Sequence, residues 1–112
     1  MQIAEYRIGD NIVLEVLETR LGADKAPAFK EAVLGFFTAG PTSIVLDLGR
    51  VEFIDSSGLG AILGVLKRMP KESELLICRP SDAVASMFKL TRMDRVFTIC
   101  KTVDEAVATL SR

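Results

Sequence analysis

The sequence has 112 residues, of which 49% are hydrophobic and 26% are charged, with a formal net charge of −1 and no histidine. This length and composition are typical of a globular protein, so we expect one domain over residues 1–112 whose core needs neither disulfides nor metals. The charge balance argues against nucleic acid binding through a basic surface, and the missing histidines exclude catalysis with an imidazole base and zinc sites built on histidine.

The N-terminal residues predict a β-hairpin. Residues 2–8 (QIAEYRI) alternate weakly between hydrophobic and polar types, and residues 11–17 (NIVLEVL) form a second hydrophobic run. The "GDN" between these two runs is typical of a tight turn. Residues 18–24 (ETRLGAD) are then expected to form a loop.

A first helix is predicted after this loop. It is expected to run from about Lys25 to Thr38, with Asp24 as its cap and Pro27 in its first turn. The residues "AGP" at 39–41 are expected to end it.

Strands and helices alternate in the rest of the chain. The strands are predicted at 43–48 (SIVLDL, a buried central strand followed by a connection over 49–53), 74–78 (ELLIC) and 95–100 (RVFTIC). The helices are predicted from about Ser57 to Arg68, from the cap Ser81 to about Leu90, and after the capping box 102–105 (TVDE), with Val103, Ala106, Val107 and Leu110 on one stripe. The order ββαβαβαβα predicts an α/β layer domain with a mostly parallel sheet and an antiparallel N-terminal edge hairpin.

No hydrophobic run approaches the roughly 20 residues that are needed to span a bilayer. The N-terminal stretch "MQIAEYRIGD" has no basic leader followed by a hydrophobic region, so we expect a cytoplasmic protein that does not act at a membrane. Cys78 and Cys100 each end a hydrophobic run, which favours buried free thiols over a disulfide in a reducing compartment.

The helix predicted from Ser57 has two different faces. Its hydrophobic stripe, which is expected to face the sheet, consists of Leu59, Ile62, Leu63 and Leu66. The opposite, smooth face consists of Ser57, Gly60, Ala61, Gly64 and Arg68. Glycine inside a helix costs about 1 kcal/mol relative to alanine, so the two glycines need a reason. Either a partner approaches this face closely, or the helix packs tightly on a neighbour within the fold.

Two serines, Ser56 and Ser57, lie at the N-terminal end of this helix within "FIDSSGLG". One serine is sufficient for an N-terminal cap, so the second hydroxyl is expected to be free. A helix N-terminus favours negative charge, and a phosphoryl group would be tolerated there. It would add about −1.5 to −2 charges beside Asp55 and repel an acidic or apolar partner surface.

Other chemistries fit these residues less well. The nucleophile elbow G-x-S-x-G and the phosphate-binding loop G-x-x-x-x-G-K-[ST] are not matched. The dinucleotide motif G-x-G-x-x-G is half met, since Gly58 and Gly60 fit but position 63 is leucine. The acids Asp47, Glu52 and Asp55 could bind Mg²⁺, although acids in loops are more often solvated, and Asp55 could instead cap the turn.

Residues 43–69, "SIVLDLGRVEFIDSSGLGAILGVLKRM", resemble the signature of the STAS family in its anti-sigma factor antagonist branch. In that family a strand ends in D-S-S/T-G-L before the second helix. The later "MFKLTRMDRVFTIC" is similar to the family's third helix and last strand. The resemblance covers essentially the whole chain.

This resemblance implies a phosphorylation switch. An anti-sigma factor that is also a serine kinase would phosphorylate Ser56, and a PP2C-type phosphatase would remove the phosphate. The unphosphorylated chain would bind the kinase and free its other client, often a sigma factor. The chain itself would catalyse nothing and need no cofactor, since ATP belongs to the kinase. The expected partner-binding residues are Asp55, Ser57, Gly58, Gly60, Ala61, Gly64, Arg68, Gly22 and Asp24.

The chain departs from the family pattern at Gly22. Many relatives carry a G-E-L-D-like stretch before the first helix, and Gly22 stands where its aspartate would fall. Asp24 is two residues further on and either substitutes for that aspartate or only caps the helix. The alternatives to a phosphorylated antagonist are a STAS scaffold subunit of a membrane transport complex and a nucleotide-binding STAS regulator.

Overall fold

The computed structural model describes residues 1–37, 40 and 42–111. A five-stranded sheet lies at its centre, in the order β1-β2-β4-β6-β7. Its strands are β1 (Ile3–Ile8), β2 (Asn11–Val16), β4 (Ser43–Asp47), β6 (Glu74–Cys78) and β7 (Thr98–Cys100). β1 runs antiparallel to β2, and the other neighbouring strands are parallel. The mixed sheet predicted from the sequence is therefore confirmed, with β4 at its centre.

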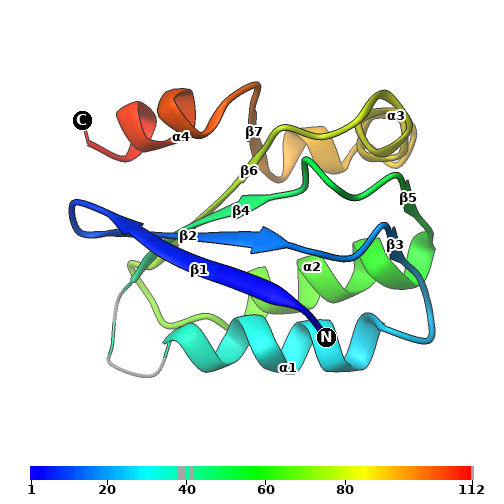
Figure 1. The fold of residues 1–112 in the computed structure, drawn as a ribbon, viewed down its shortest axis with the longest axis horizontal. Coiled ribbons are helices and arrows are strands. Elements are labelled where there is room, and N and C mark those ends of the chain that lie inside the picture. The colour runs from blue at the N-terminus through cyan, green and yellow to red at the C-terminus, as the bar shows by residue number, and fades with distance from the viewer. Residues whose placement is uncertain (38–39, 41, 112) are drawn as a thin grey trace.

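Helices cover both faces of this sheet. They are α1 (Ala26–Leu34), α2 (Ser56–Arg68), α3 (Asp82–Leu90) and α4 (Val103–Leu110), with short 3₁₀ turns at Gly35–Phe37 and Met93–Arg95. Figure 1 shows α1 and α2 side by side below the sheet and α4 above it. The alternation of helices with parallel strands follows from the crossover that each parallel pair requires. No helix in the described part of the chain is long and hydrophobic enough to cross a membrane.

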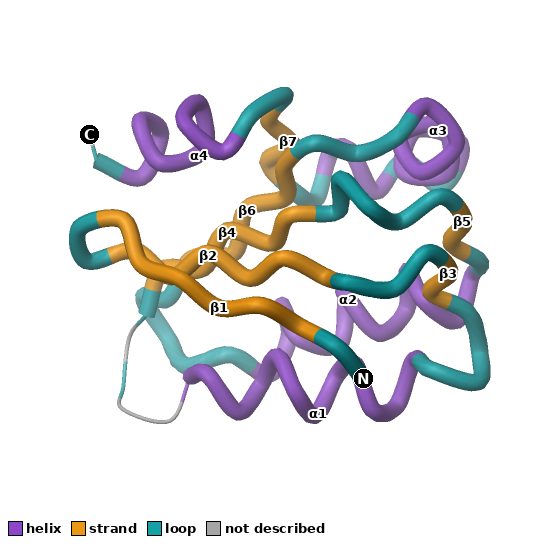
Figure 2. The backbone as a smooth tube through the Cα atoms, in the orientation of Figure 1, coloured by secondary structure: helices purple, strands orange, loops and turns teal. Residues whose placement is uncertain are grey.

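A second, two-stranded sheet lies beyond the end of the main one (Figure 2). It pairs β3 (Arg20–Leu21) with β5 (Phe53–Ile54) in parallel. The sequence placed β3 in a loop and β5 partly in a connection, and both expectations were wrong. Two-residue strands are too short to show a hydrophobic period, and this pairing joins segments more than thirty positions apart.

The start of α1 also differs from the prediction. Lys25, not Asp24, occupies the N-cap position, and no side chain caps the helix. The carbonyl oxygen of Gly22 instead accepts hydrogen bonds from the amides of Lys25 and Ala26. Pro27 does lie in the first turn, as expected. The predicted helix end at Thr38 lies outside the described residues.

The later caps agree with the sequence. The Ser81 hydroxyl oxygen accepts a hydrogen bond from the Val84 amide at 3.3 Å, and that of Thr102 accepts one from the Glu105 amide at 3.0 Å. The last strand is shorter than predicted and begins at Thr98, because the residues before it form the second 3₁₀ turn.

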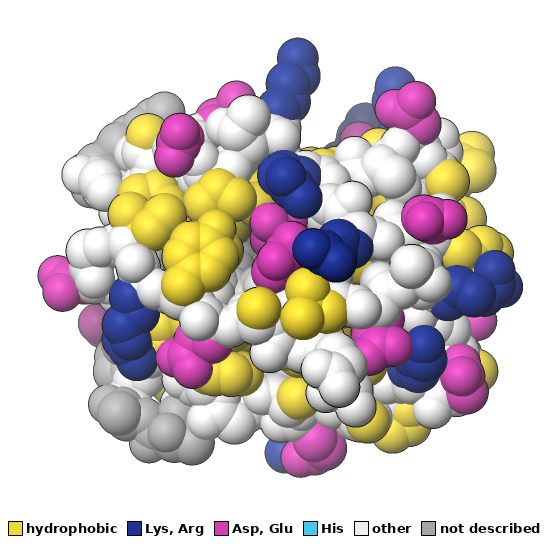
Figure 3. Space-filling view, viewed as in Figure 1, with side chains coloured by type: hydrophobic (Ala, Val, Ile, Leu, Met, Phe, Trp, Pro, Cys, Tyr) yellow, Lys and Arg dark blue, Asp and Glu magenta, His cyan; other side chains and the backbone are white. Residues whose placement is uncertain are grey.

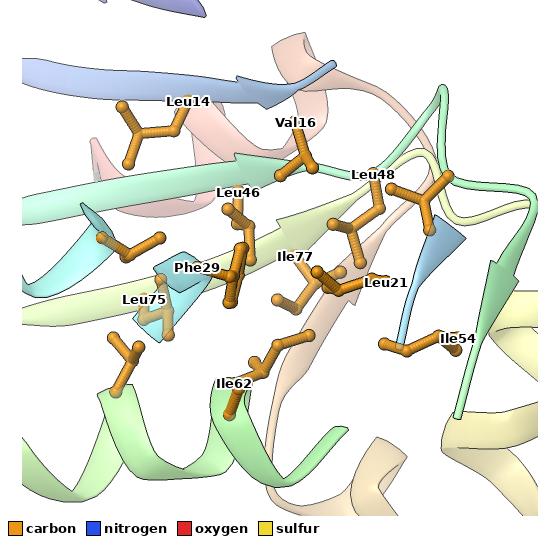
Figure 4. Packing of buried hydrophobic residues seen from close by; sticks show 14 of the residues in the cluster. Leu14, Val16, Leu21, Phe29, Leu46, Leu48, Ile54, Ile62, Leu75 and Ile77 are labelled. Carbon is orange, nitrogen blue, oxygen red and sulfur yellow. The ribbon is translucent and has the colours of Figure 1, made fainter. Parts of the chain in front are cut away.

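The hydrophobic core is divided by the sheet into two clusters. The larger one lies between the sheet and the helices α1, α2 and α3. In Figure 4, Leu14, Leu46 and Ile77 of the strands lie over Phe29 of α1 and Ile62 of α2. The smaller cluster contains the residues that alternate with these on the strands, together with α4: Val13, Val45, Leu76, Cys78, Cys100 and Ala106. The period-two alternation of the strands thus supplies both clusters.

Both cysteines are buried free thiols, as predicted. Burial, and secondarily the Asp47 carboxylate, raises the pKa of Cys78 to about 12. A thiol whose pKa is higher in the folded chain stabilises the fold at low pH, and this contribution is lost as the pH rises from about 9 to about 12. We therefore expect Cys78→Ala to show a shallower loss of stability over this range than the wild type in urea unfolding series. Equal slopes for the two proteins would contradict this prediction.

Candidate functional site

The N-terminus of α2 presents the two serines at the surface. Asp55 is the N-cap residue, and its Oδ1 accepts a hydrogen bond from the Gly58 amide at 2.9 Å. Ser56 and Ser57 are the first two residues of the helix, and both are exposed. Of the two caps that the sequence offered, a serine and Asp55, the structure therefore uses Asp55. Neither hydroxyl is needed for the cap.

Asp55 also ties the helix to the loop that precedes α1. Its Oδ2 accepts a hydrogen bond from the Ala23 amide at 3.2 Å, and its own amide donates to the carbonyl of Leu21 at 3.4 Å. One carboxylate therefore holds two segments that are 32 positions apart. The loop residues Gly22 and Asp24, singled out in the sequence, lie beside the N-terminus of α2 as a result.

Two glycines allow this close approach. Gly58 is buried, and a Cβ atom there would overlap the Leu21 carbonyl and lie 2.8 Å from Cγ1 of Ile54. Gly22 is also buried, and a Cβ atom there would lie 3.1 Å from Oδ2 of Asp55. An aspartate at position 22 would therefore bring a second carboxylate against Asp55. Asp24 is exposed, and its carboxylate lies in the same region, with Oδ1 3.5 Å from that Cβ position.

The smooth face of α2 is partly covered by α1 and partly open. Gly64 is half-buried, and a Cβ atom there would lie 3.0 Å from Cε of Lys30 on α1. Ala61 is buried in the larger hydrophobic cluster, between the sheet and the helices. Gly60 is exposed, and nothing lies within 4 Å of the position its Cβ would take. Gly64 therefore faces the flexible end of the Lys30 side chain, whereas Gly60 leaves open surface.

A groove of about 370 Å³ runs between α1 and α2 beside the serines. It is lined by Ala26, Pro27, Lys30, Glu31, Ser57, Gly60 and Ala61. The exposed Arg68 lies at the other end of α2, with its guanidinium 3.9 Å from the Glu31 carboxylate. The lining combines small and hydrophobic residues with one basic and one acidic side chain. The sequence did not predict the α1 side of this groove, because it depends on how the two helices pack.

The loop before α1 is held at its other end as well. The Lys25 ammonium donates a hydrogen bond to Oε1 of Glu18 at 2.7 Å, and the Gln2 amide donates to Oε2 at 2.8 Å. These two hydrogen bonds lower the pKa of Glu18 below its usual value. The loop is thus fixed at Glu18 and again at Asp55, which places Asp24 on a defined part of the surface.

The three acids considered for Mg²⁺ have separate roles. Asp47 is buried, and its Oδ1 accepts hydrogen bonds from the Gly49 amide at 2.9 Å and from Nε of Arg79 at 3.0 Å. The hydrogen bond between Arg79 and Asp47 is the main reason why the pKa of Arg79 is raised. Glu52 is exposed and Asp55 is the helix cap. Among the described residues, no three acids, cysteines or histidines gather as a metal site would require.

Comparison of the sequence with those of known proteins points to one family. The family model described as "STAS domain" matches residues 4–106. A Thermotoga maritima protein that has been assigned as an anti-sigma factor antagonist is 32% identical to this chain over 109 residues. The alignment covers 96% of this chain and 96% of that protein.

Solved structures of similar fold cover nearly the whole chain. An anti-sigma factor antagonist from Mycobacterium paratuberculosis has a TM-score of 0.89 at 23% identity and covers 99% of this chain and 94% of its own. The Bacillus protein SpoIIAA in its phosphorylated form has a TM-score of 0.70 at 17% identity and covers 97% of this chain and 99% of its own. At these identities the likeness is one of fold.

Proposed function

Because the chain belongs to the STAS domain family, in its anti-sigma factor antagonist branch, we propose that it is a binding module controlled by phosphorylation of Ser56. Its partner is an anti-sigma factor that is also a serine kinase. The unphosphorylated chain binds this kinase and frees the kinase's client. The phosphorylated chain is released, and a PP2C-type phosphatase restores it.

The position of Ser56 is the observation that carries this proposal. Its side chain is exposed in the first turn of α2, next to an aspartate that already caps the helix. A phosphoryl group at this place adds about −1.5 to −2 charges where the helix dipole favours negative charge, so the fold tolerates it. The change is confined to the surface that a partner meets. The solved phosphorylated form of SpoIIAA supports this, because that protein keeps a similar fold.

The docking face proposed for the kinase surrounds this serine. Ser57, Gly60 and Arg68 supply its exposed part on α2, and Asp24 supplies a carboxylate from the loop. Ala61 and Gly64 keep the helix close to α1, which forms the groove. Asp55, Gly58 and Gly22 hold loop and helix together beneath this face, so their part is to position it.

The open surface at Gly60 lets the backbone of a partner helix or loop approach closely. A dianionic group on Ser56 then lies at the edge of the contact and repels acidic groups of the kinase and of its bound nucleotide. In this scheme the chain catalyses nothing and binds no cofactor, and ATP is consumed by the kinase. The chain acts in the same compartment as its kinase.

We expect the switch to depend on Ser56 and not on its neighbour. Pull-down from the native cell with the Ser56→Ala variant identifies the kinase. Mass spectrometry of the wild type, after incubation with that kinase and ATP, is then expected to find a single phosphate on Ser56. In calorimetry, Ser56→Asp is expected to bind the kinase at least about tenfold more weakly than wild type, since a like charge at an interface costs 1.4 kcal/mol or more. Ser56→Ala is expected to keep its affinity.

Ser86→Asp is the matched control, because it makes the same change at an exposed helical residue of α3 outside the proposed docking face, and it is expected to bind as the wild type does. A phosphate found on Ser57, or a Ser56→Asp variant that binds as tightly as the wild type, would show that Ser56 is not the switch. Thermal unfolding of each variant separates lost binding from lost folding.

A further inference from the structure

The first strand has a free edge. β1 is the terminal strand of the main sheet, and no other strand among the described residues pairs with its outer side. Figure 2 shows it in front of the sheet, with neither helix nor loop in front of it. An unpaired strand edge offers a row of amides and carbonyls to which another strand can add.

The register of the hairpin determines which residues offer these groups. A two-residue turn joins β1 to β2, with Ile8 opposite Asn11. The pair that closes such a turn is hydrogen-bonded, and hydrogen-bonded pairs then recur at every second position. The hydrogen bond from the Leu17 amide to the Gln2 carbonyl continues this series. The backbones of Gln2, Ala4, Tyr6 and Ile8 therefore face β2, and those of Ile3, Glu5 and Arg7 face outward.

Two copies of β1 can pair antiparallel in only a few registers. Residues with outward backbones must oppose one another. The two-fold axis therefore lies midway between the two copies of one residue, and it is named by that residue. An axis through Glu5 opposes glutamate to glutamate, and an axis through Arg7 opposes arginine to arginine. An axis through Tyr6 opposes Glu5 of each copy to Arg7 of the other.

The register about Tyr6 also brings hydrophobic side chains of the two copies opposite one another. Ala4, Tyr6 and Ile8 lie on the face opposite to Glu5 and Arg7 because side chains alternate along a strand. With the axis through Tyr6, the two tyrosines meet and Ala4 of each copy opposes Ile8 of the other. Tyr6 is 42% exposed in the single chain. Figure 3, seen from the same side, shows hydrophobic side chains beside acidic and basic ones over β1.

We propose that this chain forms a symmetric dimer in which β1 pairs antiparallel with β1 of a second copy about Tyr6, so that one sheet runs through both copies. Charges on an edge strand also discourage pairing with foreign strands. Here they have opposite signs two residues apart, and within one chain they form only an exposed contact of 3.7 Å. Each copy can exchange this contact for a cross-strand pair, and the charges thereby select one register.

Charge exchange tests the register directly. Sedimentation equilibrium is measured from about 1 to about 500 µM, a range suited to a small interface. The wild type is expected to dimerise within it. Glu5→Arg and Arg7→Glu are each expected to weaken the dimer about tenfold, because both cross-strand pairs become repulsive. The double variant Glu5→Arg with Arg7→Glu, and an equimolar mixture of the two single variants, are expected to dimerise as the wild type does.

A backbone variant tests the strand pairing itself. Glu5→Pro removes an outward amide without removing a bond to β2, whereas Glu5→Ala removes only the charge. The proline variant is expected to be monomeric and the alanine variant to dimerise more weakly than wild type. Tyr6 is the only tyrosine in a chain without tryptophan, so its fluorescence anisotropy follows the same equilibrium. A wild type that is monomeric throughout, or single charge variants that dimerise unchanged, would overturn the proposal.

Discussion

Replacing Gly58 with alanine is expected to destabilise the fold by about 3 kcal/mol, the upper range for an added methyl group in a packed interior. The new methyl group would overlap the Leu21 carbonyl, which is backbone and cannot turn away, and would lie 2.8 Å from Cγ1 of Ile54. Relief of this overlap requires β3 and the loop after it to move from the N-terminus of α2. We expect urea unfolding to report the loss. We also expect the Asp55 contact with that loop to weaken.

Gly60→Ala is the matched control, because it makes the same change two residues further along the same helix. Nothing lies within 4 Å of the added methyl group, so the variant is expected to gain up to about 1 kcal/mol from helix propensity. The proposed docking face makes a second prediction for it, namely weaker kinase binding in spite of the higher stability. Equal stabilities for the two variants would show that α2 is not held against Leu21 as described.

Removal of the Arg79 side chain is the second large effect. Arg79→Met would leave the buried Asp47 carboxylate with the Gly49 amide as its remaining hydrogen-bond donor. Losing one partner of a buried pair costs about 3–5 kcal/mol. The Arg79 side chain is 45% exposed, so water can partly replace it, and we expect a loss of about 2–3 kcal/mol. Urea unfolding at neutral pH measures this loss.

Two further variants make this prediction specific. Arg50→Met removes a guanidinium that lies 3.5 Å from Glu15 and is 63% exposed, and it is expected to cost less than about 1 kcal/mol. Asp47→Asn combined with Arg79→Met removes the buried charge as well and is expected to recover part of the stability. If Arg50→Met costs as much as Arg79→Met, burial of Asp47 does not account for the effect.

Short-range patterns in the sequence predicted much of this structure. The continuous hydrophobic runs over residues 43–48 and 74–78 predicted strands that the sheet buries on both faces. The period of 3.6 after Ser57 correctly placed Leu59 and Ile62 inward. It was wrong for Ala61, which was assigned to the smooth face but is buried, whereas Leu63 and Leu66 of the predicted stripe are only partly buried. Ser81 and Thr102 were recognised as caps because a cap acts on an amide three residues away. The stretch "FIDSSGLG" was recognised as the candidate site because it places two serines at a helix N-terminus and resembles the family motif.

Contacts between distant residues could be found only in the tertiary structure. The sequence alone gave no sign that Asp55 would hold the Ala23 amide, that Arg79 would reach Asp47, or that β3 would pair with β5. It also could not separate Gly64, which packs against Lys30, from Gly60, which stays open. Periodicity and capping depend on neighbours within about one helical turn, whereas these contacts depend on how the whole chain packs.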